Sequence, residues 1–247
     1  MSRHLAHASH RGTASPKLSA DVFAAGPARR QIRNAAGVPT LPLVIFKRSA
    51  AVAALVGGFL LGFLDFVWIK FVPYPLGGLG NSLAVWAVAA FFFTYAGRWG
   101  RLRSVAAAIV LLVVAVPSYY VAAALIQHDD FSNAYGSVAF LWMFFAVIAG
   151  FVFGGAGVVA RAPGRWQTAA LAMPAAVLFA EAAILARRIG DPSYGSEPLW
   201  PALIDVALGA LAIVLLTNHR RRRLSVLVLA VPLTAVGFAF LSVARFG

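Results

Sequence analysis

Apolar segments recur along this 247-residue chain, most of them close to the length of a membrane span. A helix of about 20 residues crosses the roughly 30 Å of hydrocarbon in a bilayer. The segments lack the alternation of apolar and polar residues that barrel strands show. The sequence therefore predicts an all-α integral membrane protein, a bundle of about seven transmembrane helices. The seven segments are Ser49–Phe71, Asn81–Gly97, Ser104–Ile126, Ser137–Ala160, Gln167–Ala186, Leu199–Thr217 and Leu224–Ala244.

The composition excludes several classes of soluble protein. Hydrophobic residues make up 61% of the chain, charged residues 12%, and the mean hydropathy is +0.83, which is too apolar for a water-soluble domain of this length. The net charge is +13, but the basic residues lie in short loops and in the N-terminal tail, a pattern that indicates topology and anionic lipid rather than nucleic acid. Cysteine is absent, which excludes disulfides and thiolate metal sites.

Basic residues in the loops predict the orientation of the bundle. Alternate loops carry nine Arg residues on one side and three Lys or Arg residues on the other. Because cytoplasmic loops are enriched in Lys and Arg, the first side is predicted to be cytoplasmic. We therefore expect a bacterial cytoplasmic membrane protein with a cytoplasmic N-terminus and an extracytoplasmic C-terminus. The nine residues are Arg98, Arg101, Arg103, Arg161, Arg165, Arg220, Arg221, Arg222 and Arg223.

The N-terminal tail differs from the rest of the chain. Residues 1–42 are rich in Ser, His, Arg, Gly and Pro and contain no apolar run of signal-peptide length. They are predicted to form a disordered basic cytoplasmic tail, and residues 43–247 a seven-span transmembrane domain. An alternative is that translation starts near Val38 or Val44.

Small residues predict where helices touch. Ala50, Ala54, Gly58 and Gly62 recur at four-residue spacing in the first span, and Gly150 and Gly154 repeat the pattern in the fourth. Such ridges let a second backbone approach closely. Packing within the chain is the simpler interpretation, and a docking face for a partner membrane subunit is the alternative.

Three carboxylates inside the spans are the best indicators of a functional site, because ionisable side chains are costly in lipid. Asp65, Glu181 and Asp205 each lie six residues from the predicted outer end of a span, a depth of roughly 9 Å. Four further residues of the same layer complete the predicted ligand-binding set: Asn81, Trp86, Tyr119 and Tyr120. We expect an outward-facing polar pocket closed by an apolar plug.

Local ion pairs at the helix ends are the alternative interpretation of these carboxylates. Asp65 would pair with Lys70, and Glu181 with Arg187 or Arg188. Neither spacing stacks well on one helix face, so pairing between helices or with a ligand is favoured.

Catalytic and metal motifs are weak. The run His128-Asp129-Asp130 offers imidazole and carboxylate groups, but adjacent residues cannot converge on one ion without ligands from elsewhere, and a solvated loop is the default. No serine with a histidine partner, HExxH helix or phosphate loop occurs in a span. We predict no metal and no cofactor, and an enzyme is the less favoured class.

The segment that begins with Asn81, Ser82, Ala84 and Trp86 resembles the N-S-x-A-x-W…A-F…G signature of a family of small actinobacterial multi-pass membrane proteins, known only as a domain of unknown function (family 6518). Glu181 falls where that family tends to place an intramembrane glutamate. The resemblance covers about residues 51–243 and implies the topology without an activity. Other matching positions are Ser118, Tyr119, Tyr120, Gly150, Gly154, Gly157, Arg161, Arg165, His219, Arg220 and Pro232.

Three functions are consistent with these residues. The first is a small-molecule binding or transport component, with the carboxylates holding a cationic or polar solute and the aromatic residues supplying flat contact surface. The second is a non-catalytic membrane scaffold or assembly partner, and the third an intramembrane enzyme that uses paired carboxylates.

Overall fold

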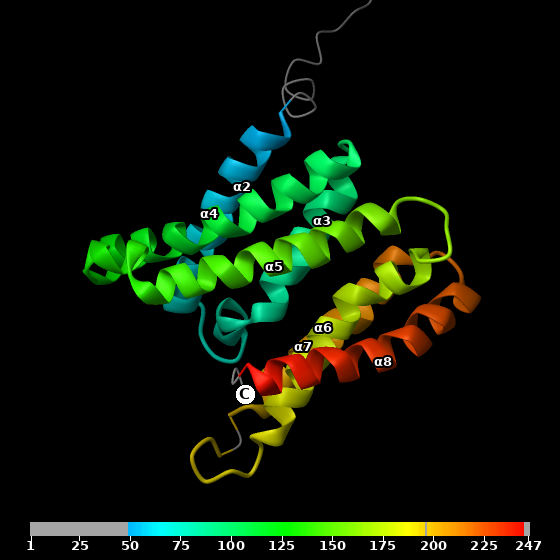
Figure 1. Cartoon of the computed structure of the whole chain (residues 1–247). Coiled ribbons are helices and arrows are strands. Elements are labelled where there is room, and N and C mark those ends of the chain that lie inside the picture. Colours follow the sequence, from blue (N-terminus) through cyan, green and yellow to red (C-terminus); the bar gives the residue numbers. More distant parts are fainter. Residues whose placement is uncertain (1–48, 196, 245–247) are drawn as a thin grey trace, which may run out of the picture. The chain divides into compact units, whose positions relative to one another are not determined.

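The computed structural model describes residues 49–195 and 197–244, so the predicted tail, residues 1–42, lies outside the described residues. The described ranges are helical and contain no strand (Figure 1). The elements are α2 (Ala50–Phe71), η2 (Leu76–Asn81), α3 (Leu83–Gly97), α4 (Arg101–Gln127), η3 (Phe131–Tyr135), α5 (Ser137–Ala160), α6 (Gln167–Arg187), α7 (Leu199–Leu216) and α8 (Arg220–Val243).

The predicted fold class is confirmed: the chain is an all-α membrane protein. Within the described ranges six helices are long and apolar enough to cross a bilayer, and α3 is a shorter apolar helix of 15 residues. At 1.5 Å per residue, α3 is about 22 Å long. Seven spans and the orientation of the termini stay predictions.

Two helices begin earlier than their apolar segments predict. The helix α4 starts at Arg101 rather than Ser104, and α8 starts at Arg220 rather than Leu224. Arginine is a good helix former, and its long side chain can extend from a helix end into the polar interface. An apolar segment therefore predicts the membrane-embedded part of a helix and not the whole helix.

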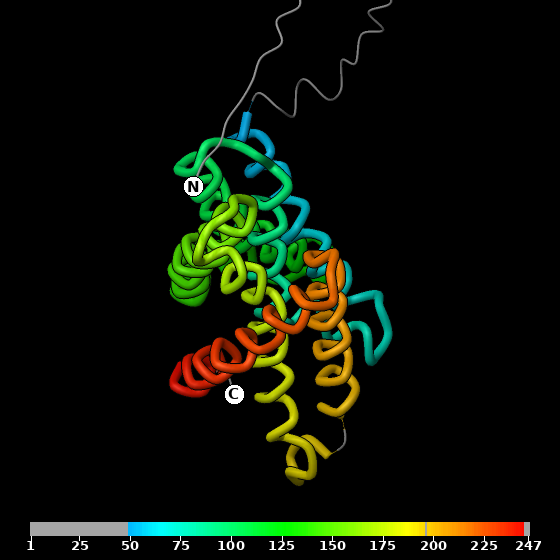
Figure 2. Tube along the Cα trace, turned by 90° about the vertical axis from the view of Figure 1, so that its right-hand side faces the viewer, coloured from blue at the N-terminus to red at the C-terminus, as the bar shows by residue number. Residues whose placement is uncertain are grey.

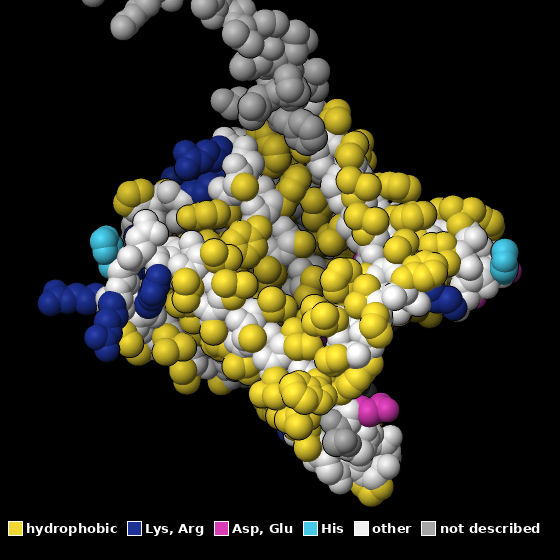
Figure 3. Space-filling view, turned by 180° about the vertical axis from the view of Figure 1, so that it is seen from behind, with side chains coloured by type: hydrophobic (Ala, Val, Ile, Leu, Met, Phe, Trp, Pro, Cys, Tyr) yellow, Lys and Arg dark blue, Asp and Glu magenta, His cyan; other side chains and the backbone are white. Residues whose placement is uncertain are grey.

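The exposed surface of the helices is largely apolar. Phe144, Phe151 and Val228 are each more than 60% exposed, in the middle of long helices. Figure 3 shows apolar side chains over most of one face, with charged side chains gathered at its edges. Because lipid tails accept such surface and water does not, a bilayer is the environment that fits these helices.

The small-residue ridges of α2 and α5 both pack against α4. A Cβ atom added at Gly58 would collide with the carbonyl oxygen of Leu111, and one added at Gly62 with that of Ala115. At Gly150 it would lie 2.6 Å from the Cα atom of Ile109. These positions are therefore filled by α4 of the same chain, as the intramolecular interpretation predicts, and they are not open to a partner subunit.

The other ridge positions are also enclosed. Ala54 is fully buried and Ala50 packs partly buried against the same cluster, which includes Ala108. Gly154 faces the Cβ atom of Ala108, and the hydroxyl of the buried Thr94 donates to the carbonyl oxygen of Gly154 at 2.9 Å. This close approach ties α3 and α4 to α5.

The helices form two groups. Helices α2, α3, α4 and α5 pack together, and α6 packs on both α7 and α8 (Figure 1). Figure 2 shows α6 and α7 side by side, with α8 crossing α6 obliquely. The groups meet where α3 and α5 contact α6. This junction holds the candidate site.

Candidate functional site

The first turn of α3 carries the start of the site. Ser82 is the N-cap residue, and its hydroxyl oxygen accepts a hydrogen bond from the backbone N–H of Val85 at 3.1 Å. A serine at this position is a strong helix-start signal, because it satisfies one of the backbone donors that a helix leaves unpaired at its beginning.

The carboxylate of Glu181 satisfies further donors of the same turn. It accepts hydrogen bonds from the Ser82 hydroxyl at 2.7 Å, from the backbone N–H of Ala84 at 2.8 Å and from that of Leu83 at 3.2 Å. An anion at a helix N-terminus is also stabilised by the helix dipole. Glu181 thus joins α6 to α3.

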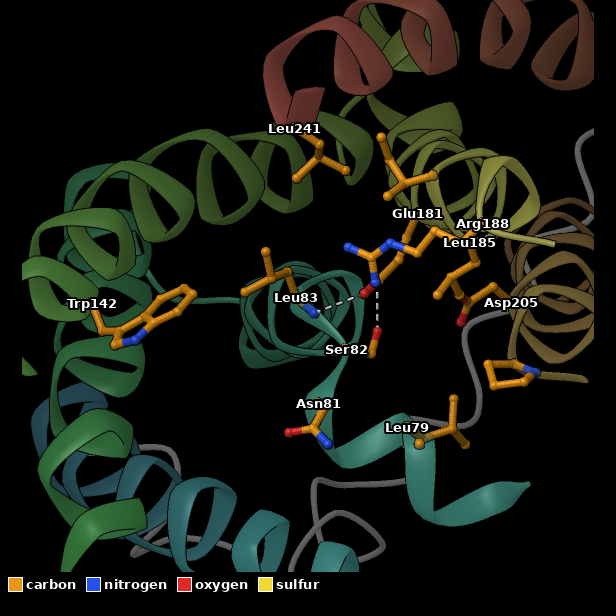
Figure 4. Close-up of a pocket in the computed structure, with 13 residues that line it drawn as sticks. Leu79, Asn81, Ser82, Leu83, Trp142, Glu181, Leu185, Arg188, Asp205 and Leu241 are labelled. Carbon is orange, nitrogen blue, oxygen red and sulfur yellow. Dashed lines mark hydrogen bonds between the residues drawn. The ribbon is translucent and has the colours of Figure 1, made fainter. Parts of the chain in front are cut away.

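A cavity of about 360 Å³ opens beside these hydrogen bonds (Figure 4). Figure 4 shows Glu181, Arg188 and Asp205 on one side of it and Trp142 of α5 facing them from the other. The residues that line it are Gly78, Leu79, Asn81, Ser82, Leu83, Trp142, Glu181, Ile184, Leu185, Arg188, Pro201, Asp205 and Leu241. Most of this lining is apolar, with a few polar groups, as in many small-molecule sites.

Asp205 lies on the wall that α7 contributes. Its side chain is 2% exposed, and its carboxylate has no hydrogen-bond donor or cation within hydrogen-bonding distance in the described part of the chain. The negative charge of the nearby Glu181 carboxylate repels that of Asp205. A buried charge without a partner is costly, so this carboxylate is suited to pair with a cationic group that enters the cavity.

Arg188 gives the cavity a basic group as well. It is the C-cap residue of α6, and its Cζ atom lies 5.1 Å from the centre of the Tyr194 ring. The cavity thus offers carboxylates and a guanidinium group together, which is a set that can bind a solute carrying both charges.

The structure divides the predicted ligand-binding residues into two groups. Asn81, Glu181 and Asp205 line the cavity. Asp65, Trp86, Tyr119 and Tyr120 lie outside its lining. The Asp65 carboxylate lies near the Trp86 side chain, and the rings of Tyr119 and Tyr120 are 5.6 Å apart in an edge-to-face arrangement. These four residues lie on α2, α3 and α4, and both α2 and α3 contact α4.

Trp142, Arg188 and Leu241 line the cavity but were not part of the predicted set. One of them had a signal in the sequence, since Arg188 lies seven residues after Glu181 and two helical turns bring it to the same face. Trp142 and Leu241 sit in uniformly apolar helices, where nothing in the sequence marks the side that faces the cavity.

The basic residues that local pairing would have used make contacts between helices. Lys70 donates to the Gln127 side chain of α4 at 3.2 Å, and the guanidinium of Arg187 lies over the Phe238 ring of α8 at 5.5 Å. No ion pair of Asp65 with Lys70, or of Glu181 with Arg187, occurs in the residues that the structure describes.

The loop run His128-Asp129-Asp130 joins the end of α4 to the start of η3. The Asp130 carboxylate accepts a hydrogen bond from the backbone N–H of Ser132 at 2.8 Å, and this bond lowers the pKa of Asp130. His128 adopts a positive φ of 61° and ends α4. Asp130 therefore has a capping role in this loop.

A model of a family described as "Family of unknown function (DUF6518)" matches residues 47–245 of the chain. The chain therefore belongs to this family, and the resemblance drawn from Asn81, Ser82, Ala84 and Trp86 is confirmed. No curated protein and no solved structure matches the chain.

Proposed function

We propose that this DUF6518 protein binds a small cationic or polar solute in the cavity between α3, α6 and α7, as a binding or transport component of a bacterial cytoplasmic membrane. The observation that carries the proposal is Asp205. This buried carboxylate lines a cavity of about 360 Å³ and has no donor among the described residues, so a cationic group can supply the missing partner.

The two carboxylates of the cavity have different parts in this proposal. Glu181 is already engaged by three donors at the start of α3, so it fixes the wall of the cavity. Asp205 supplies the charge that binds the solute, and the Trp142 ring across the cavity offers a flat face for a cation or an apolar group (Figure 4).

The distribution of basic residues predicts the side of the membrane to which the cavity opens. Arg98, Arg161 and Arg220 lie at one end of the bundle, and the cavity is lined near the other ends of α6 and α7. Positive residues mark the cytoplasmic side, so the cavity would open outward.

Glu181 also favours the second candidate function, a non-catalytic scaffold. A carboxylate whose hydrogen bonds join two helices stabilises a bundle without any ligand. On this alternative the cavity is a packing defect at the junction of the two helix groups.

Thermal unfolding of the purified full chain in detergent separates these functions. Small amines, zwitterionic amino acids and simple polar solutes would be added one at a time, and binding to the folded state should raise the unfolding midpoint. The Asp205→Asn variant should fold and lose the rise. Asp65→Asn is the matched control, because it neutralises a carboxylate of α2 outside the cavity lining and should keep the rise. No response of the native protein, or an equal response of Asp205→Asn, would contradict the binding proposal.

A further inference from the structure

A second cavity lies at the Arg-rich end of the bundle, apart from the one described above. It has a volume of about 320 Å³ and is lined by Tyr95, Arg98, Trp99 and Arg161, from the end of α3, the turn before α4 and the end of α5. Two arginine residues and a tryptophan thus border one cavity.

The hydrogen-bonding groups around this cavity are mainly donors. Arg161 donates from Nη2 to the Trp99 carbonyl oxygen and to the Ser104 hydroxyl, both at 3.3 Å, which leaves Nε and Nη1 without an acceptor in the described ranges. The indole N–H of Trp99 is buried and also lacks an acceptor there. Arginine and tryptophan side chains donate and cannot accept, so they call for an acceptor group.

Positive charge at this end has no counter-charge in the described part of the chain. The acidic residues of the described ranges are Asp65, Asp129, Asp130, Glu181, Asp191, Glu197 and Asp205. None of them lies in the α3–α4 turn or at the end of α5. Partial burial together with the charge of Arg98 lowers the pKa of Arg161, which indicates that the two guanidinium groups repel each other.

Local structure holds the Arg161 side chain and the Arg98 backbone in place. Arg98 ends α3 in a left-handed conformation with φ of 50°, and Arg161 is tethered to the α3–α4 turn by its two hydrogen bonds. The first turn of α4 follows at Arg101 with no side-chain cap, so its free N–H groups add positive potential nearby. Two neighbouring, like-charged guanidinium groups are stabilised by an anion between them.

We propose that the cavity lined by Tyr95, Arg98, Trp99 and Arg161 binds a phosphate group. Arginine pairs with phosphate through parallel N–H···O bonds, and two arginines border this cavity. The group belongs either to the headgroup of an anionic phospholipid, a ligand that basic pockets between membrane helices bind, or to a free phosphate.

The test is thermal unfolding of the full chain in detergent with two pairs of additions. Phosphatidylglycerol is compared with phosphatidylcholine at equal mole ratio, and inorganic phosphate with chloride at equal ionic strength. We expect a rise in midpoint of about 5 °C from one member of a pair. A rise with phosphatidylglycerol alone assigns the phosphate to lipid, and a rise with inorganic phosphate assigns it to a free anion.

Variants show whether the rise comes from this cavity. Arg98→Asn keeps a residue that tolerates the left-handed conformation and removes the guanidinium, so the rise should disappear. Arg103→Gln removes one exposed charge two residues into α4, outside the cavity lining, and should keep the rise. If Arg98→Asn does not fold, Arg161→Lys keeps a positive charge in the cavity lining but loses the planar, paired donors of the guanidinium, and should reduce the rise.

Three results would overturn the phosphate site. They are no rise in the native protein with either anion, the same rise in the cavity variant as in the native protein, and equal loss in Arg98→Asn and Arg103→Gln. The last result would mean that the anion responds to the charge of the whole surface.

Discussion

The Glu181 carboxylate lies 2.8 Å from the backbone nitrogen of Ala84, a residue 97 positions earlier in the chain. This contact makes a side chain of α6 part of the first turn of α3. It explains why a carboxylate is present inside a span, where an unpaired charge is costly. The carboxylate of Glu181 therefore stabilises the fold whether or not a ligand is bound.

Glu181→Gln is therefore expected to destabilise the protein by about 1–3 kcal/mol, because the amide group turns one acceptor of the carboxylate into a donor facing other donors. The lower midpoint of thermal unfolding in detergent would measure this loss. Asp205→Asn is the control, since it removes a buried charge without a donor and should leave the midpoint unchanged or raise it. Equal midpoints for Glu181→Gln and the native protein would contradict the capping role.

Ser82→Ala should lower the stability by about 1–2 kcal/mol, because it removes the N-cap oxygen and one donor to Glu181. A double variant with Glu181→Gln should cost less than the sum of the single changes, since both act on the same turn. Strictly additive costs would mean that the two side chains act independently.

Gly150→Ala and Gly155→Ala form a matched pair on α5. The added Cβ at Gly150 would press on the backbone of Ile109, whereas at Gly155 nothing lies within 4 Å. We expect Gly150→Ala to destabilise by about 1–3 kcal/mol and Gly155→Ala to be neutral or to stabilise by up to about 1 kcal/mol. Similar effects of both changes on the unfolding midpoint would remove the role of close helix packing.

Topology is tested with reporters. The predicted orientation places Gly247 outside and Gly164 in the cytoplasm, because the Arg-rich loops mark the cytoplasmic side. An alkaline phosphatase fused after Gly247 should be active, and one inserted after Gly164 inactive. Activity at Gly164 with inactivity at Gly247 would reverse the bundle and place the larger cavity on the cytoplasmic side.

Removal of residues 1–40 should leave insertion and folding intact. The family match begins at residue 47, and the removed part contains no apolar segment that could span the membrane. The amount of protein in the membrane fraction and its unfolding midpoint would be compared with those of the full chain. Loss of the folded protein on truncation would show that the tail takes part in the fold.

The sequence predicts the fold well because a lipid environment imposes a simple rule on helix length. The segment Ser137–Ala160 is predicted without error, and the others differ at their ends by a few residues. The largest differences occur where arginines precede an apolar run, as at Arg220, because such residues extend a helix beyond the hydrocarbon.

The site was harder to predict because the sequence indicates how deep a residue lies in the membrane but not which neighbouring helix it faces. Asp65, Glu181 and Asp205 share a predicted depth, yet Asp65 lies near Trp86 of α3 and outside the cavity lining. Which side of a helix faces which neighbour depends on packing, and the uniformly apolar spans carry little signal about it. The hydrogen bonds of Glu181 could not be foreseen without knowing that α6 contacts α3.

The bond between Glu181 and the start of α3 also orders events during synthesis. Chains grow at about 5–20 residues per second, so the 97 residues that separate Ala84 from Glu181 take about 5–20 s to make. Throughout that interval α3 has its own Ser82 as a cap but not the carboxylate of α6. The first turn of α3 therefore gains its remaining hydrogen-bond acceptor only after α6 has been made and lies beside it. The junction of the two helix groups thus forms from residues that the ribosome produces far apart in time.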